Sequence, residues 1–206
     1  MVRIHRIADA QVLTESTFKP TPRLIRFIEQ GLVVIDDPGE PHVLVGPDYA
    51  HTLEAPDARD RVAAVMVSHE GKQLVTGSMD GSLTTWAAGK DRMSAANSLP
   101  LARIGPPSAR LLGRAVISAM DRSLDGQTYA IAVLDNDDKT RNRIVVFSPA
   151  APSNGFIIPT PGLRLPTPRF LDGGRTLCAV AADRVLRWDL SDQARAAPVQ
   201  RFPRRS

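Results

Sequence analysis

The chain has only one cysteine, Cys178, and lacks any long apolar run. A single thiol cannot form an intramolecular disulfide, and its apolar strand-like surroundings predict a buried, inert side chain. No stretch approaches the roughly 18 apolar residues of a membrane span, and residues 1–6 lead into no apolar signal segment. These absences predict a cytoplasmic location and no membrane partner.

Cationic residues are frequent but scattered along the sequence. Lys and Arg together number 26 against 22 Asp and Glu, which gives a net charge of +4, and only four of the 26 are lysines. A nucleic-acid surface needs clustered cations, preferably interleaved with exposed aromatic side chains. The densest group is the tail at 201–205, which we expect to be solvated. The charge pattern therefore predicts no nucleic-acid partner.

Residues that could carry catalysis or hold a metal do not fall into working patterns. His69-Glu70 begins as a zinc-protease helix does, but Gln73 stands where the second histidine is needed. The acidic run at 135–138 is similar to a calcium loop, but Lys139 takes the third ligand position. No glycine-rich phosphate loop or nucleophile elbow is present. We therefore expect no catalytic residue, no metal and no cofactor.

The stretch 61–86, RVAAVMVSHEGKQLVTGSMDGSLTTW, has the pattern of three short strands joined by two tight turns. An apolar run over 62–67 is short enough for a buried strand, and a polar turn follows at 69–72. Asp80-Gly81 is a hairpin-turn signal between two segments rich in β-branched residues. Two consecutive hairpins predict an antiparallel meander that ends at Trp86.

The same unit recurs along the chain. Near the C-terminus a turn at 172–174, a strand at 176–180 and a turn at 182–183 precede a strand that ends in Trp188-Asp189. Between these copies, Asp125-Gly126 precedes a strand that begins at Tyr129, and a further strand ends at Phe147. A fainter copy is predicted around strands at 23–27 and 32–35, with Ile35 in the place of the closing tryptophan. Since one meander cannot bury both faces, the copies must stack.

These copies resemble the blades of the WD-repeat family, whose repeats of roughly 40 to 45 residues each supply four strands. The interval from Phe147 to Trp188 falls within that range, whereas Asp57-Ala58 stands where the family has Gly-His. The resemblance implies an all-β fold, a partial β-propeller of about three to four four-stranded antiparallel blades. The residues that it assigns to the structural blade motif are Thr76, Asp80, Gly81, Trp86, Asp125, Gly126, Phe147, Asp183, Trp188 and Asp189.

Domain boundaries follow from the same alignment. We expect a degenerate N-terminal blade and an insertion loop over 1–60, blades over 61–190, and a last strand or basic tail over 191–206. Polar, turn-forming segments at 47–61 and 88–110 are predicted to be surface insertions. Four blades fill the whole length, so the ring is predicted to be part of a longer propeller, to be completed by self-association, or to close with few blades.

The function that the resemblance implies is a non-catalytic scaffold for protein or peptide partners, such as the partner-binding arm of a larger bacterial signalling protein. Loops on a rigid scaffold often carry binding, so the two insertions and the turn at 135–143 are the candidate contacts. The alternative is a propeller-fold enzyme, a hydrolase or a quinoprotein-like dehydrogenase, with its site at the channel mouth.

Overall fold

The computed structural model describes the chain in segments separated by gaps. The described residues are 2–5, 12–16, 24–28, 31–35, 41–45, 51–54, 62–67, 73–88, 93–105, 115–138, 142–160, 163, 166–180, 184–191 and 200–203. In the strands before residue 62 the description covers the backbone and the side chain of Val34, and in 200–203 it covers the backbone.

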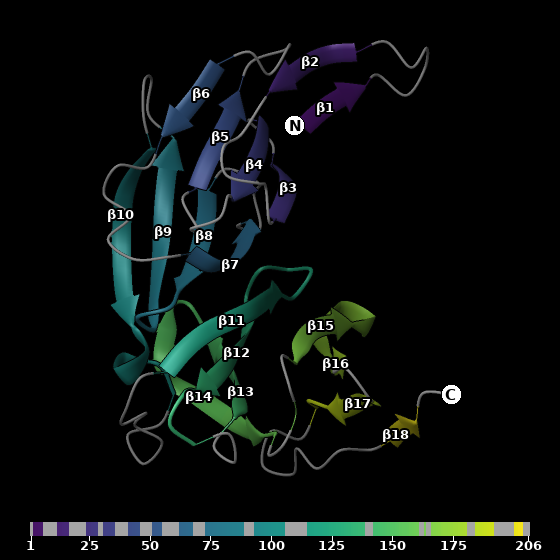
Figure 1. Ribbon diagram of the computed structural model, residues 1–206. Coiled ribbons are helices and arrows are strands. Elements are labelled where there is room, and N and C mark those ends of the chain that lie inside the picture. Colours follow the sequence, from purple (N-terminus) through teal and green to yellow (C-terminus); the bar gives the residue numbers. More distant parts are fainter. Residues whose placement is uncertain are drawn as a thin grey trace.

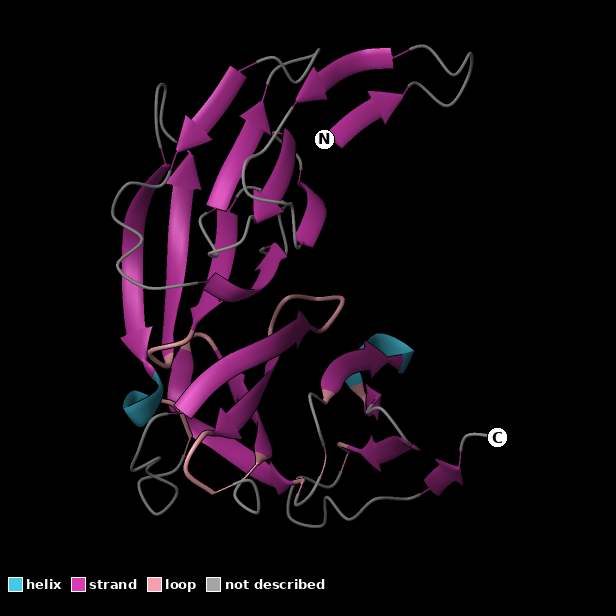
Figure 2. Ribbon diagram, viewed as in Figure 1, coloured by secondary structure: helices cyan, strands magenta, loops and turns pink. Residues whose placement is uncertain are grey.

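Strands dominate the described residues, and the two helices are single short 3-10 turns (Figure 2). The strands are β1 (Val2–His5), β2 (Val12–Ser16), β3 (Leu24–Ile28), β4 (Gly31–Ile35), β5 (Pro41–Val45), β6 (His51–Glu54), β7 (Val62–Val67), β8 (Gln73–Ser78), β9 (Ser82–Ala88), β10 (Met93–Pro100), β11 (Ala115–Arg122), β12 (Tyr129–Asp135), β13 (Arg143–Ser148), β14 (Ala151–Pro159), β15 (Thr167–Leu171), β16 (Thr176–Val180), β17 (Arg184–Asp189) and β18 (Gln200–Pro203). The 3-10 turns are η1 (Leu101–Arg103) and η4 (Asp172–Gly174).

Each group of four consecutive strands from β3 onward forms one antiparallel sheet, in the orders β3-β4-β5-β6, β10-β9-β8-β7, β11-β12-β13-β14 and β15-β16-β17-β18. The hairpin of β1 and β2 is a separate two-stranded sheet. The prediction of an all-β chain built from antiparallel sheets is confirmed. In the described part of the chain, neither helix has the length and apolar character that a membrane crossing requires.

The turns that punctuate these sheets form where the sequence predicts them. At the β8–β9 turn, Gly81 takes a φ of 80° and its N–H donates to the carbonyl of Ser78. The Asp80 carboxylate accepts a hydrogen bond from the Ser82 N–H at 2.7 Å, which fixes the turn. Glycine is required at this position because a Cβ on Gly81 would lie 2.8 Å from the carbonyl oxygen of Ala115.

Neighbouring sheets pack face to face through two apolar cores. The first lies between the β7–β10 and β11–β14 sheets and includes Val75, Ile117 and Val145. The second lies between the β11–β14 and β15–β18 sheets and includes Ile144, Leu177 and Trp188. The β11–β14 sheet is therefore covered on both faces, which explains why its central strands are apolar almost throughout.

The first strand of each sheet lies beside the first strand of the next. β3 contacts β7, β7 packs against β11, and β11 packs against β15. Among the described strands no comparable packing joins the β15–β18 sheet back to the β3–β6 sheet. The four sheets accordingly follow one another along an open arc in Figure 1, with the first strands toward its inner side.

Two sequence predictions are wrong in this part of the fold. Ile35 does not hold the position of a closing third-strand residue, because it ends β4, the second strand of its sheet. The segments at 47–61 and 88–110 are not simply insertions, because β6 and β10 lie inside them and complete their sheets. An outer strand can be exposed on both faces, so it need not show the alternating apolar residues of a buried strand. The small and polar residues of β6 and β10 therefore look like loop sequence.

The buried phenol of Tyr129 gives a prediction for alkaline pH. Its ring meets Phe147 edge to face at a centroid distance of 5.8 Å. Burial raises the pKa of Tyr129, and the nearby Arg122 lowers it in part. In the unfolded chain a tyrosine ionises near pH 10, so above that pH the unfolded state gains free energy of ionisation that the folded state lacks.

We therefore expect part of the stability to be lost as pH rises above about 10, and Tyr129→Phe to remove that part. Urea unfolding of both proteins at about pH 8 and about pH 11 measures it. The two proteins share Tyr49, so only Tyr129 can account for a difference. Equal losses in both proteins would contradict the prediction.

Candidate partner-binding site

The residues of the predicted blade motif lie mostly in the core and the turns of the sheets. Thr76 and Trp86 come together, because the Trp86 indole Nε1–H donates to the Thr76 hydroxyl at 2.8 Å in a buried setting. Asp80 is exposed and bonds within its own turn. The Thr76–Trp86 bond and the Asp80 turn therefore position strands of the β7–β10 sheet.

The later motif residues have the same structural character. Trp86, Phe147 and Trp188 are buried at equivalent third-strand positions, opposite Leu74, Tyr129 and Leu177 of the second strands. In the β11–β12 turn, the Asp125 carboxylate accepts the Ser123 hydroxyl and the Gln127 N–H, and Gly126 takes a φ of 71°. Hydrogen bonds from Ser191 lower the pKa of the exposed Asp189. Asp183 lies outside the described residues.

In the acidic turn at the end of β12, an aspartate side chain is hydrogen-bonded to backbone N–H groups of the same turn. Asp135 is buried, and its carboxylate accepts the N–H groups of Asp137 and Asp138 at 3.0 Å each. Asn142 holds the other side of this turn through its bonds to the Asp135 N–H and the Leu163 carbonyl. This part of the predicted contact turn at 135–143 is therefore anchored to the fold by Asp135 and Asn142, while Asp137 is exposed at its tip.

Other residue types with possible chemistry are dispersed. Within the described ranges no group of three or more His, Cys, Asp or Glu side chains could hold a metal ion. Burial raises the pKa of the Cys178 thiol, so the thiolate that would react is disfavoured. The side chains of the four histidines, and the whole of the His69-Glu70 pair, lie outside the described residues.

The end of β11 is hydrogen-bonded to both neighbouring sheets. Arg122 donates through Nε to the Val67 carbonyl at the end of β7, at 2.7 Å. Asp121 accepts the Phe170 N–H near the end of β15 at 2.8 Å and also accepts from Arg169 at 3.3 Å. The C-terminal ends of β7, β11 and β15 therefore lie together at one end of their sheets. We call it the Leu124 end, after the residue in the β11–β12 turn.

Asp121 is expected to contribute measurably to the stability of this junction. Asp121→Ala leaves the partly buried Phe170 N–H without its acceptor, so we expect a loss of about 1–2 kcal/mol in the free energy of unfolding. Arg169→Ala breaks only an exposed ion pair and should cost about 0.5 kcal/mol or less. Urea unfolding compares the two variants, and equal losses would show that the bond to Phe170 contributes nothing.

A cleft of about 430 Å³ opens at the Leu124 end, between the β11–β14 and β15–β18 sheets. Its lining comes from the end of β11 and the β11–β12 turn on one side, and from β15 and η4 on the other. Leu124 and Leu171 line it although 76% and 47% of their surfaces are exposed. The hydrogen bonds that Asp121 accepts from Phe170 and Arg169 join the two walls of the cleft.

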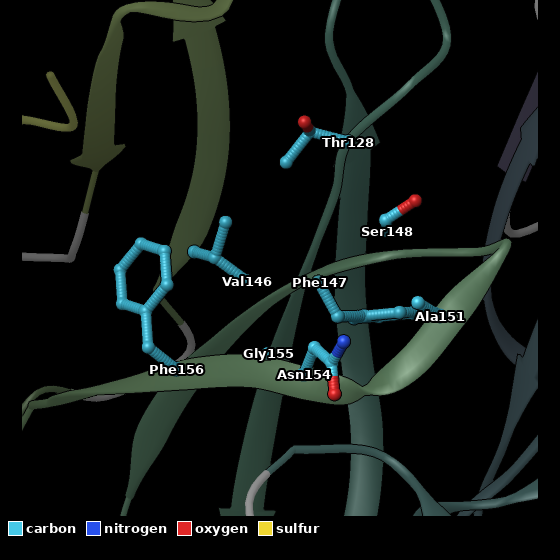
Figure 3. Close-up of a pocket in the computed structure, with 8 residues that line it drawn as sticks. All are labelled: Thr128, Val146, Phe147, Ser148, Ala151, Asn154, Gly155 and Phe156. Carbon is cyan, nitrogen blue, oxygen red and sulfur yellow. The ribbon is translucent and has the colours of Figure 1, made fainter.

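A second recess of about 280 Å³ lies at the same end of the β11–β14 sheet, on its outer strands. Figure 3 shows its lining, with Val146 and Phe156 on one side and the side chains of Thr128, Ser148 and Asn154 on the others. We call it the outer pocket. No ionisable side chain lines it, so it suits uncharged groups that form hydrogen bonds.

The floor of the outer pocket depends on a glycine. A Cβ on Gly155 would lie 2.7 Å from both the Phe147 Cβ and the Val146 carbonyl oxygen. The strand β14 can approach β13 this closely only without a side chain, at the point where a bulge shifts their register. Gly155 therefore shapes the recess, and a larger residue would displace β14.

Neither recess was evident from the sequence. The lining of the cleft joins residues about fifty positions apart, which only the packing of two sheets brings together. Asn154-Gly155 is a dipeptide typical of turns, yet both residues lie inside β14. Two sequence signals fall at the cleft: Asp125-Gly126, which placed the β11–β12 turn that carries Leu124, and the predicted turn at 172–174, which forms η4.

No protein-family model matches this sequence, and no curated protein matches it either. The resemblance to WD-repeat blades thus depends on the turns, strands and closing aromatic residues described above.

Proposed function

We propose that the four-stranded sheets are blades of a partial β-propeller. Three features support this assignment. Each sheet is a meander of four consecutive strands, the first strands lie side by side along the inner side of an arc, and a buried aromatic residue closes the third strand of each of the last three sheets. Full closure would remove sheet edges, so an open arc leaves room for further strands from another source.

We further propose that the chain is a non-catalytic scaffold that binds a protein or peptide at the Leu124 end. The supporting observation is the pairing of Leu124 and Leu171 across one cleft. The described residues include four large hydrophobic side chains that are exposed, and the other two, Met79 and Val180, lie at the opposite end of their sheets. Two exposed apolar side chains on a braced cleft have the character of an interface centre.

The polar groups around the cleft suit a peptide better than a small charged ligand. The outer pocket, at the same end of the β11–β14 sheet, is lined by two residues with hydroxyls and one with an amide, which can pair with the N–H and C=O groups of a polypeptide. The walls of the cleft carry both signs of charge, with Asp121 and Asp172 beside Arg122. A partner would therefore place an apolar side chain between the two leucines and its backbone toward the outer pocket.

Affinity capture with matched variants tests this proposal. The immobilised chain should recover one protein selectively, and the double change Leu124→Ser with Leu171→Ser should reduce its recovery at least about tenfold. The control carries Met79→Ser and Val180→Ser, which remove the other two exposed large hydrophobic side chains of the described residues, at the opposite end of their sheets. Equal loss in both variants, or turnover of a substrate with no partner recovered, would overturn the scaffold proposal.

A further inference from the structure

The strand β10 forms the outer margin of the β7–β10 sheet (Figure 1). Its inner side pairs with β9 over most of its length. Five consecutive residues of β10, at positions 94–98, are exposed, so neither face of this part of the strand is covered. A strand in this position presents a row of backbone N–H and C=O groups to which another chain can pair.

The other outer strands carry residues that oppose such pairing. β6 contains Glu54, β14 contains Pro152, and β18 contains Arg201 and Pro203. Charged residues and prolines at sheet edges are the usual protection against pairing with another chain. The sequence of β10, MSAANSLP, has no charge at all and reaches its proline only at the last position.

The sequence of β10 also fits a copy of itself. An antiparallel pair related by a two-fold axis through Ala96 sets Ser94 opposite Ser98 and Ala95 opposite Asn97 of the second copy. Two-fold pairing brings any charged residue of the strand close to the same charge of the second copy, which is unfavourable. Because β10 contains no charged residue, its pairing with a second copy meets no such repulsion. Its small side chains allow close approach of the two backbones.

One feature of β10 restricts this pairing. Ala96 is the extra residue of a bulge opposite β9, and a bulge increases the local twist of a strand. Two copies related by a two-fold axis carry the same right-handed twist, so the segments on either side of the bulge can continue one twisted sheet. We propose that β10 pairs with β10 of a second copy, so that the two β7–β10 sheets become one continuous sheet in a two-fold dimer.

Charge substitution at the centre of β10 tests the proposal. Ala96→Lys and Ala96→Glu each place like charges opposite one another across the axis, so each protein alone should sediment as a monomer where the wild type sediments as a dimer. An equimolar mixture of the two should restore the dimer, because opposite charges then meet. Sedimentation equilibrium over a range of concentrations measures all three samples. Ser153→Lys, which adds a charge to the exposed part of β14, is the control and should remain dimeric.

The pattern of results separates this pairing from other associations. A wild type that stays monomeric at every concentration overturns the proposal, and so does a dimer that persists in Ala96→Lys. Open-ended assemblies, or a mixture that fails to restore the dimer, would also overturn the two-fold arrangement. Circular dichroism melting of each variant checks that the exposed substitution leaves the fold intact.

Discussion

Replacing Trp188 with alanine should lower the free energy of unfolding by about 3–5 kcal/mol. The indole is 1% exposed and lies in the core between the β11–β14 and β15–β18 sheets, with Ile144, Val146 and Leu177 in the same cluster. Its removal leaves a cavity between the two sheets. The neighbouring side chains cannot fill this cavity, because hydrogen bonds within each sheet fix the positions of their strands. Urea unfolding at neutral pH measures the loss.

A matched control for this variant lies on the other face of the same sheet. Val180 is 41% exposed, and Val180→Ala should change the free energy of unfolding by about 0.5 kcal/mol or less. The contrast reflects both the burial of Trp188 and the larger volume that its replacement removes. A loss below about 1 kcal/mol for Trp188→Ala would contradict the packing of these two sheets.

Replacing Gly77 with alanine should cost about 1–3 kcal/mol through overpacking between the β7–β10 and β11–β14 sheets. A Cβ at this position would overlap the Ile117 Cγ2 and would lie 2.7 Å from the Met120 Cε. Both neighbours are in the buried core, so the added methyl group can be accommodated only if β8 and β11 move apart. The strand backbone itself tolerates alanine, so the cost arises from the sheet-to-sheet contact.

A double-mutant cycle isolates that contact. Ile117→Ala alone removes core volume and should destabilise by about 2–5 kcal/mol, but in the Gly77→Ala background the smaller side chain also relieves the clash. The loss in the double variant should therefore be smaller than the sum of the single losses. Gly173→Ala is the comparison glycine, because no atom lies within 4 Å of its Cβ and only its φ of 65° opposes the change. Additive losses at Gly77 and Ile117 would contradict direct packing.

The strands of the central sheets were predictable from the sequence because local chemistry determines them. Asp80-Gly81 and Asp125-Gly126 specify turns, and the apolar, β-branched segments between the turns specify strands that are buried on both faces. The outer strands were not predictable in this way. β10 is exposed along 94–98 and is rich in Ala, Ser and Asn, so hydrogen bonds to β9 define it rather than side-chain pattern.

The candidate site was less accessible to sequence reasoning than the fold was. In the sequence, Leu124 is one apolar residue in a polar turn, and nothing there indicates a binding role. It becomes a candidate contact because Leu171 lines the same cleft. The bond from Asp121 to the Phe170 N–H joins two strands whose proximity follows from packing between sheets rather than from hydrogen bonding within one. The turn at 135–143 had the composition of a contact loop, yet Asp135 and Asn142 turn their polar groups inward.

The most direct test of the proposed scaffold is a methyl NMR titration of the chain with its captured partner. With leucine and valine methyl groups labelled, the partner should shift the Leu124 and Leu171 signals first and most strongly, and Val146 in the outer pocket should follow. Val180, at the opposite end of its sheet, should remain unchanged. Shifts centred on Val180, with Leu124 and Leu171 unaffected at saturation, would contradict binding at the Leu124 end.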